Sequence, residues 1–277
     1  MVAELDALIH RVRQGLSTVE LVYTPHARWP LPPRDREPPR QLRVSVLDSS
    51  FNPPTLAHLA LARLSPPGAF NARLLLLSVR NADKSLKAGD ATYAQRLQMM
   101  TLLAQEASAD DAAVAIADEP TFVGKSRTLQ AYLQHRLSAL APSAGVRPPV
   151  PELTFVVGID TLERILAVRY YASEDNMRRA LRGFLSPSGD ASRLLCARRV
   201  TPDSLETSDD RERRVAAEVG KYLEPGCVEM VDIGGDVESY SSSEVRQRIA
   251  EGDSLWTQMV PSPVAEYIRT QGLYVQE

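Results

Sequence analysis

The sequence SFNPPTLAH at residues 50–58 places a threonine and a histidine three positions apart, where a helix is expected to follow a short strand. Residues three apart lie on one face of a helix, so Thr55 and His58 can point at the same group. A histidine ring donates hydrogen bonds and is easily biased towards its cation beside phosphates. The helix start adds backbone N–H groups and the positive end of the helix dipole. The pattern predicts a site for nucleotide phosphates.

A second candidate phosphate site lies in the sequence YSSSEVR at residues 240–246. Ser242 and Ser243 are expected at a helix N-terminus, where they can cap the helix and offer hydroxyl and N–H groups to a phosphate. Arg246 lies one turn further on the same face. Taken alone, the segment is best explained as an ordinary helix cap. Its occurrence together with the first motif favours a phosphate site.

Both motifs follow segments that are expected to be strands. The strand-like segments cover residues 43–47, 73–78, 112–117, 153–157, 193–196 and 227–233. Helical patterns cover residues 55–64, 91–107, 125–140, 161–167, 176–182, 209–222, 242–251 and 262–271. Short apolar strands that alternate with amphipathic helices are typical of a parallel sheet covered on both faces. We therefore predict an α/β fold with a Rossmann-like, doubly wound parallel sheet of about six strands.

The residues before this sheet differ in composition. Residues 4–12 have helical apolar spacing, and residues 24–40 are crowded with proline, which excludes a regular helix or a central strand. We expect residues 1–41 to form a helical and proline-rich arm, with an extended connector, on a single domain at 42–277. A proline-rich ligand for another protein remains an alternative for the arm.

Further candidate residues follow the other strands, because ligands of doubly wound sheets bind beyond the carboxyl ends of the strands. Gly158 permits close approach of a ligand, and Asp160 can accept hydrogen bonds from ribose hydroxyls. Lys84 follows the second strand and could contact an anionic substrate. The candidates after the third and fifth strands are Thr121, Phe122, Arg127, Thr128 and Arg198.

Composition excludes several classes of protein. The 277 residues are 44% hydrophobic and 24% charged, as in ordinary globular proteins. The formal net charge of −3 argues against a dedicated nucleic-acid binder. No apolar run reaches the ~18–20 residues of a membrane span, and the start of the chain lacks the order of a signal peptide. We expect a soluble protein of the cytoplasm, the nucleus or both. The sequence has no GxGxxG after the first strand and no GxxxxGK[ST], so neither a dinucleotide-binding dehydrogenase nor a P-loop enzyme is indicated.

The motifs together resemble those of the nucleotidyltransferase superfamily. Residues 50–58 are similar to its first signature, residues 240–246 to its ISSTxIR signature, and Gly158-Ile159-Asp160 to its GxD. The resemblance covers residues 42 to 271. The SFNP turn with threonine in place of the first histidine resembles the nicotinamide mononucleotide adenylyltransferases, and residues 159–171 resemble a fungal branch of them. Ser49 stands where the family usually has glycine; because serine resists positive φ, either the turn differs or this position is not strained.

This resemblance implies that ATP and nicotinamide mononucleotide react to give NAD and pyrophosphate. The phosphate oxygen of the mononucleotide attacks the α-phosphorus of ATP in line. That oxygen is already an anion, so the enzyme needs no general base; it must hold two anionic groups together and neutralise the developing charge. The resemblance also implies Mg²⁺, held mainly by phosphate oxygens and water.

The resemblance further implies a role for each candidate residue. Catalysis would fall to His58, Thr55 and Arg246. The ATP site would comprise Ser50, Phe51, Asn52, His58, Gly158, Asp160, Arg198, Ser242, Ser243 and Arg246. The mononucleotide would contact Lys84, Thr121, Phe122, Arg127 and Thr128.

Two alternatives remain open. The first keeps the fold and changes the acceptor to nicotinate mononucleotide or, in a cytidylyltransferase, to a phosphorylated alcohol. The second is a nucleotide sensor without catalytic activity. The sequence also leaves a homo-oligomer open.

Overall fold

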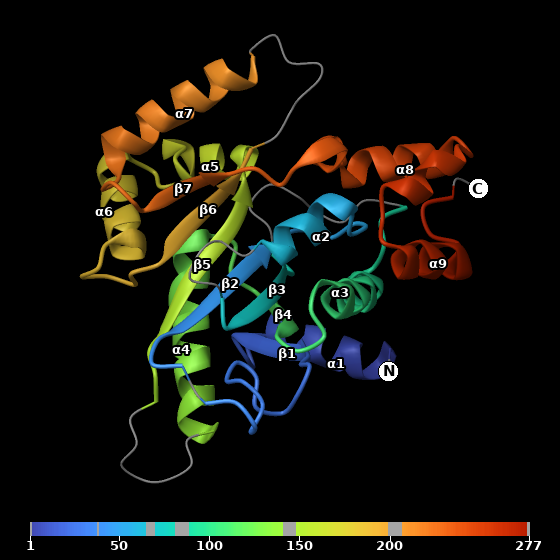
Figure 1. The fold of residues 1–277 in the computed structure, drawn as a ribbon, viewed down its shortest axis with the longest axis horizontal. Coiled ribbons are helices and arrows are strands. Elements are labelled where there is room, and N and C mark those ends of the chain that lie inside the picture. Colours follow the sequence, from blue (N-terminus) through green and yellow to red (C-terminus); the bar gives the residue numbers. More distant parts are fainter. Residues whose placement is uncertain are drawn as a thin grey trace.

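The computed structural model describes residues 2–37, 39–64, 70–80, 89–140, 148–198 and 207–275. These residues form a seven-stranded sheet with the strand order β1-β4-β3-β2-β5-β6-β7 (Figure 1). Its strands are β1 (Val19–Tyr23), β2 (Leu42–Asp48), β3 (Ala72–Ser78), β4 (Ala112–Ala117), β5 (Pro151–Gly158), β6 (Arg193–Ala197) and β7 (Val228–Val231). Because the order reverses at β2, the turn after this strand lies where doubly wound folds bind ligands.

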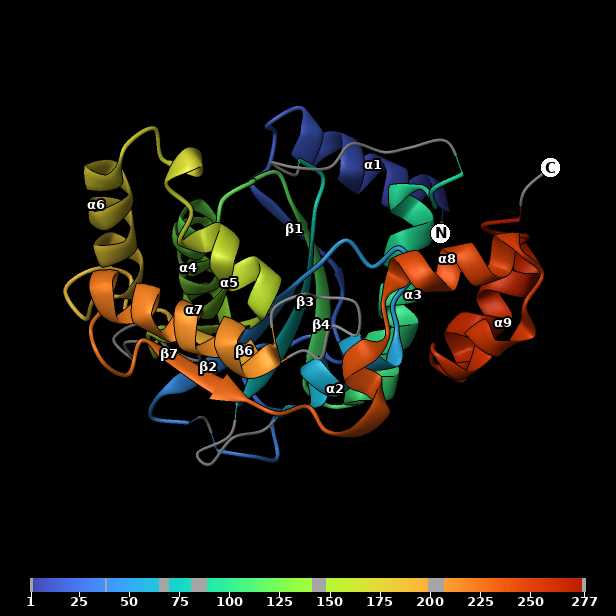
Figure 2. The same ribbon diagram turned by 90° about the horizontal axis from the view of Figure 1, so that it is seen from above.

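Helices cover both faces of the sheet (Figure 2). The α-helices are α1 (Val2–Arg13), α2 (Leu56–Arg63), α3 (Tyr93–Ala107), α4 (Phe122–Leu140), α5 (Ile159–Ile165), α6 (Glu174–Leu185), α7 (Ser208–Tyr222), α8 (Ser242–Ala250) and α9 (Ser262–Gln271). Short 3₁₀ helices are η1 (Val168–Tyr170), η2 (Gly235–Ser239) and η3 (Ser254–Gln258). Helices α4 to α7 pack on one face and α1 to α3 on the other. The predicted doubly wound α/β fold is confirmed.

The leucine run of β3 shows why these strands are apolar without alternation. Leu74 and Leu76 belong to the core under α4 to α6, whereas Leu75 and Leu77 belong to the core under α1 to α3. All four side chains are buried. A strand that is buried on both faces has no polar side to show in its sequence.

The seventh strand, β1, was not predicted. It pairs antiparallel with β4, with Val19 opposite Ala117, and forms one edge of the sheet. The remaining strand pairs are all parallel. A five-residue segment with one charged residue carries little local strand signal, so its pairing with a distant strand decides its conformation.

The proline-rich segment is packed against the sheet, which the prediction of an extended connector did not foresee. Trp29 is 1% exposed, and its Nε1 donates a hydrogen bond of 2.9 Å to the backbone oxygen of Asp111. Arg136 of α4 donates from Nε to the backbone oxygen of Trp29 at 2.6 Å. Val19 of β1, Trp29 and Leu31 are all buried in the core beneath α4 to α7.

Helices α8 and α9 and η3 share a third apolar core. Its buried side chains include Val245, Trp256, Val264 and Ile268, which pack with Met99 of α3. This packing holds the last helices beside the turn that follows β2. Among the described residues, we find no helix with the length and hydropathy that crossing a membrane requires.

Candidate functional site

The turn between β2 and α2 fixes the ring of His58. The backbone N–H of Thr55 donates to His58 Nδ1 at 3.0 Å, and Thr55 Oγ1 lies 2.9 Å from the same atom. Because Nδ1 accepts a hydrogen bond, the proton of the neutral ring lies on Nε2. That nitrogen is 2.9 Å from the hydroxyl oxygen of Ser49. Thr55 and His58 therefore lie together, and Thr55 orients the ring.

Backbone strain in this turn falls on Phe51 and not on Ser49. Phe51 has a positive φ of 44°. Ser49 is not one of the described non-glycine residues with a positive φ. The Phe51 side chain is fully buried, with its ring centroid 5.1 Å from that of His58. Serine therefore fits at position 49 without strain, which is the second of the two possibilities considered for this departure from the family.

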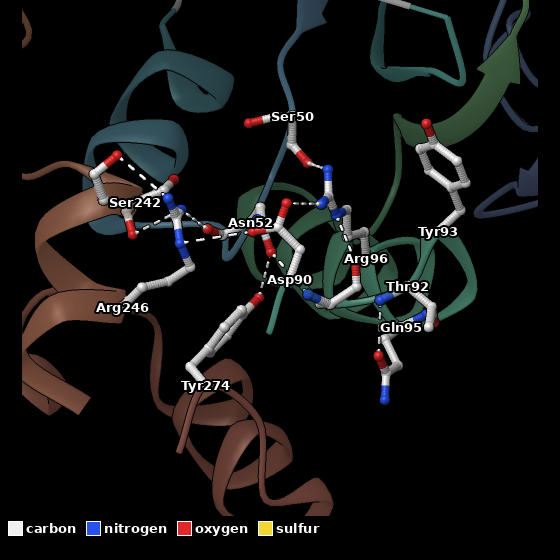
Figure 3. Close-up of polar contacts among 12 residues, drawn as sticks. Ser50, Asn52, Asp90, Thr92, Tyr93, Gln95, Arg96, Ser242, Arg246 and Tyr274 are labelled. Carbon is white, nitrogen blue, oxygen red and sulfur yellow. Dashed lines mark hydrogen bonds and ion pairs between the residues drawn. The ribbon is translucent and has the colours of Figure 1, made fainter. Parts of the chain in front are cut away.

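Asn52 is committed to contacts within the protein (Figure 3). Its Nδ2 donates to Asp90 Oδ1 at 2.7 Å, and its Oδ1 accepts from the backbone N–H of Ala91 at 3.2 Å and from the Tyr274 hydroxyl at 2.8 Å. Asn52 is 4% exposed. The side chain thus ties the turn to the residues just before α3 and to Tyr274, beyond the end of α9. Sequence reasoning expected it beside the ATP phosphates and named neither Asp90 nor Tyr274.

The second motif lies directly against this turn. Ser242 Oγ donates to the backbone oxygen of Pro53 at 2.7 Å, and Arg246 Nη1 donates to the backbone oxygen of Asn52 at 2.6 Å. Ser241, one residue earlier than expected, caps α8 by accepting from the Glu244 N–H at 3.1 Å. This arrangement leaves the Ser242 hydroxyl to hold the turn.

Ser243 is exposed, with its Oγ 3.5 Å from Arg246 Nη2.

Two arginines flank Asp90 behind the turn. Arg96 Nη2 lies 3.4 Å from Asp90 Oδ2, and Arg246 Nε lies 3.9 Å from Asp90 Oδ1. Arg96 also donates from Nη1 to the backbone oxygen of Ser50 at 3.4 Å (Figure 3). Burial lowers the pKa of Arg96, and the charge of Asp90 opposes that shift. One carboxylate between two guanidinium groups leaves a net positive charge in this group of three, which favours an anion nearby.

The GxD segment leaves space above its glycine. Gly158 precedes α5 with a φ of −85°, a conformation open to any residue. Apart from its two chain neighbours, no described residue has an atom within 4 Å of the position that a Cβ would take. Neither the backbone nor the packing thus requires glycine here, and the position borders open space. Asp160, in the first turn of α5, is 39% exposed, and its Oδ1 pairs with Arg211 Nη2 of α7.

Arg198 follows β6 and is held by two carboxylates. Its Nε lies 2.9 Å from Glu212 Oε2 and its Nη1 lies 3.0 Å from Asp232 Oδ1. Hydrogen bonds that the guanidinium donates to these carboxylates raise its pKa. Each of its three nitrogens donates to one of these two carboxylates.

The candidates after β4 belong to the start of α4. Thr121 accepts from the Gly124 N–H at 3.1 Å and donates to Glu119 Oε1 at 2.8 Å, which caps the helix. The Phe122 ring packs edge-to-face with that of Phe155 at 5.7 Å. No hydrogen bond or ion pair within the described ranges joins Arg127 or Thr128 to the turn after β2. Lys84 lies outside the described residues.

A buried ion pair that the sequence did not point to lies beneath the site. Lys125 Nζ of α4 is 2.5 Å from Asp48 Oδ2, at the end of β2. The two side chains are 5% and 11% exposed, and the ammonium lies 4.8 Å from the centre of the Phe122 ring. The pair fixes the end of β2, from which the turn to α2 departs.

Comparison with known proteins gives sequence relatives over most of the chain, whereas no family model matches it. A Schizosaccharomyces pombe protein, assigned by name to the nicotinamide mononucleotide adenylyltransferases, is 31% identical over 235 residues, which are 82% of this chain and 84% of that protein. A Geotalea daltonii protein, assigned by name to the nicotinate-nucleotide adenylyltransferases, is 25% identical over 84% of this chain and 98% of its own length.

Solved structures show the same fold. The structure of Plasmodium falciparum nicotinic acid mononucleotide adenylyltransferase complexed with APC has a TM-score of 0.52 and 12% identity, over 84% of this chain and 98% of that one. The complex with NaAD gives a TM-score of 0.51 and 15% identity over the same shares. At these identities the likeness concerns the fold alone.

Proposed function

We propose substrates and residue roles for this chain, which belongs to the nicotinamide mononucleotide adenylyltransferase family. The chain is thus a nucleotidyltransferase, as its motifs predicted. We propose nicotinamide mononucleotide as the acceptor and ATP as the donor, with NAD and pyrophosphate as products. The name of the Schizosaccharomyces pombe relative supports this choice of acceptor.

One observation carries the proposal: the two sequence motifs touch. Ser242 Oγ donates to the Pro53 oxygen and Arg246 Nη1 to the Asn52 oxygen. The N-termini of α2 and α8 therefore lie close together at the switch point of the sheet. Helix N-termini bind phosphate through their N–H groups and dipoles, and two of them side by side suit a triphosphate.

In the proposed mechanism His58 donates from Nε2 to the phosphate groups of ATP. Thr55 holds the ring so that Nε2 carries the proton. The donor strengthens as charge develops on the phosphate oxygens during in-line attack, an effect of roughly 2.7–4 kcal/mol for one such donor. Arg246, with Ser242 and Ser243, would hold the β- and γ-phosphates that leave as pyrophosphate. Ser50 and Phe51 would line the turn, with Asn52 fixing its shape from behind.

The adenosine would lie over Gly158, with its ribose at Asp160 and the purine towards Arg198. The open space at Gly158 and the 39% exposure of the Asp160 side chain support this placement. The nicotinamide side would fall to the start of α4, at Thr121, Phe122, Arg127 and Thr128, with Lys84 at the mononucleotide phosphate.

We propose that Mg²⁺ enters with the triphosphate. Within the described ranges, no group of three or more His, Cys, Asp and Glu side chains is arranged to hold a metal ion. Magnesium commonly keeps several waters and binds mainly through substrate phosphates, which suits this donor set. The ion would neutralise phosphate charge beside Arg246.

Nicotinate mononucleotide is the second candidate acceptor, favoured by the names of the bacterial relatives. A comparison of turnover with the two mononucleotides decides between them. A comparison of ATP with CTP separates both from a cytidylyltransferase.

A coupled assay tests the proposed function. Purified protein, Mg²⁺, ATP and nicotinamide mononucleotide are combined, and NAD is measured through alcohol dehydrogenase. We expect NAD from the wild type and a large loss with His58→Ala. ATP binding without NAD formation would contradict the proposal and support a nucleotide sensor or another acceptor.

A further inference from the structure

Helix α7 reaches across to the GxD segment through Arg211. Its Nε donates to Glu163 Oε1 at 3.2 Å and its Nη2 lies 2.6 Å from Glu163 Oε2. The same Nη2 pairs with Oδ1 of Asp160, one turn earlier on α5. One guanidinium therefore joins both carboxylates of α5. Neither the motifs nor the expected ribose site pointed to Arg211.

Arg211 is anchored by Glu163, and from that anchor it contacts Asp160. The two bonds to Glu163 have the fork-like arrangement that fixes an arginine in one orientation. Hydrogen bonding from Arg211 is the largest cause of the lowered pKa of Glu163. With the arginine fixed by Glu163, its Nη2 in turn fixes the direction of the Asp160 carboxylate.

The Asp160 carboxylate stays accessible while Arg211 holds it. An ionised carboxylate offers about four lone-pair sites, so it can accept hydrogen bonds from several donors at once. The Asp160 side chain is 39% exposed, against 16% for Arg211, so the arginine lies on the more buried side of the pair. The exposed side is the one that a ligand can approach.

We propose that Arg211 is a positioning residue that holds Asp160 in the orientation needed to bind the ribose hydroxyls of ATP. Through Asp160 it sets the preference for ATP over deoxynucleotides. The inference rests on the proposed function only for the placement of the ATP ribose at Asp160. A carboxylate held in place loses less freedom on binding, so removal of Arg211 weakens the ribose contact while the rest of the nucleotide site is unchanged.

Arg214 offers a matched control on the same helix. Its Nη2 donates to Glu163 Oε1 at 2.8 Å, so Arg214→Ala also removes a contact between α7 and Glu163. If the only role of Arg211 were to hold α7 against α5, the two alanine variants would act alike.

The experiment measures the dissociation constants of ATP, 2′-deoxy-ATP and 3′-deoxy-ATP by calorimetry. The proteins are the wild type, Arg211→Ala, Arg211→Lys, Asp160→Asn and Arg214→Ala. We expect the wild type to prefer ATP over at least one deoxy analogue by about tenfold, as for a hydrogen bond to a charged group. Arg211→Ala and Asp160→Asn should both lower that ratio towards one. Arg211→Lys should retain part of it, and Arg214→Ala all of it.

Several results would overturn the inference. They are equal affinity of the wild type for all three nucleotides, no ATP binding, an unchanged ratio in Arg211→Ala, or tighter ATP binding in that variant. If circular dichroism shows that Arg211→Ala does not fold, Arg211→Gln replaces it. Failure of the proposed function is a separate observation, because a wild type that binds ATP with this preference but makes no NAD would leave the positioning role standing.

Discussion

Arg246 donates a hydrogen bond of 2.6 Å to the backbone oxygen of Asn52, a residue 194 positions earlier in the chain. The bond joins the two motifs that point to nucleotide chemistry, and it uses a side chain that we also assign to the triphosphate. If this assignment holds, removal of Arg246 should affect both the shape of the turn and the binding of ATP.

We expect Arg246→Ala to raise the KM for ATP by about 10- to 100-fold, the range for a lost hydrogen bond to a charged group. Steady-state kinetics with varied ATP checks this. Arg248→Ala, on the same helix, is the control: Arg248 pairs with Glu244 at 2.9 Å and Asp253 at 2.6 Å, away from the turn, and its loss should leave the KM unchanged. Equal ATP dependence in Arg246→Ala and the wild type would contradict the triphosphate role.

His58→Ala should lower kcat by a few hundredfold or more, with the protein still folded. The proposed donor acts mainly on charge that develops in the transition state, an effect of roughly 2.7–4 kcal/mol. Single-turnover kinetics measure the rate of the chemical step, and circular dichroism shows whether the variant is folded. His135→Ala, an exposed histidine of α4, serves as the control and should keep wild-type turnover. Near-normal turnover in His58→Ala would show that the ring has no such role.

Ser49→Ala should strengthen ATP binding. In the structure the Ser49 hydroxyl oxygen lies 2.9 Å from His58 Nε2. It therefore occupies the hydrogen-bonding position beside Nε2 that a phosphate oxygen would need. Loss of that competing hydrogen bond should lower the Kd of ATP about two- to tenfold, the usual net value of one bond. Calorimetry measures it, and Ser49→Gly, which installs the residue usual in the family, should act in the same direction. Weaker binding in both variants would mean that the hydroxyl assists the phosphate contact.

Lys125→Met should lower the free energy of unfolding by about 3–5 kcal/mol, because it leaves the Asp48 carboxylate buried without its partner. Urea denaturation with linear extrapolation measures the change. The double variant Asp48→Asn with Lys125→Met removes both charges and should recover much of the loss. A decrease below ~1 kcal/mol in the single variant would show that the pair is solvated.

Alkaline pH should destabilise the protein through Tyr171. Burial raises the pKa of this phenol from 10.0 to about 12, and its hydroxyl donates to the Ile165 oxygen at 2.8 Å. A raised pKa in the folded state means that the stabilising contribution is complete below pH 10 and is lost as the pH rises towards 12. Unfolding free energies measured between pH 9 and about pH 12 should fall less steeply in Tyr171→Phe than in the wild type. Parallel curves would contradict the shift.

Most of the fold could be predicted because its signals are local. The run that contains Leu74 to Leu77 marks a doubly buried strand without any knowledge of its neighbours. The strand β1 could not be predicted in this way, because its conformation depends on pairing with β4, far along the chain. For the same reason the proline-rich segment gave no hint that Trp29 is buried.

The candidate site likewise contains residues that the local sequence could predict and residues that it could not. Thr55 with His58, and Ser242 with Arg246, are close in sequence, and their spacing predicted that they share a helix face. Asp90, Tyr274, Lys125 and Arg211 each act through a partner on another element, so their local sequence resembles that of ordinary surface or core residues. Whether each predicted residue has its assigned role stays a prediction for the experiments above.

The hydrogen bond from Tyr274 to Asn52 also has a consequence for engineering the protein. The turn after β2 is held by a side chain that lies 222 positions later in the sequence. A bulky group attached close to Tyr274 would therefore disturb that turn, and with it the activity, from a position remote in sequence.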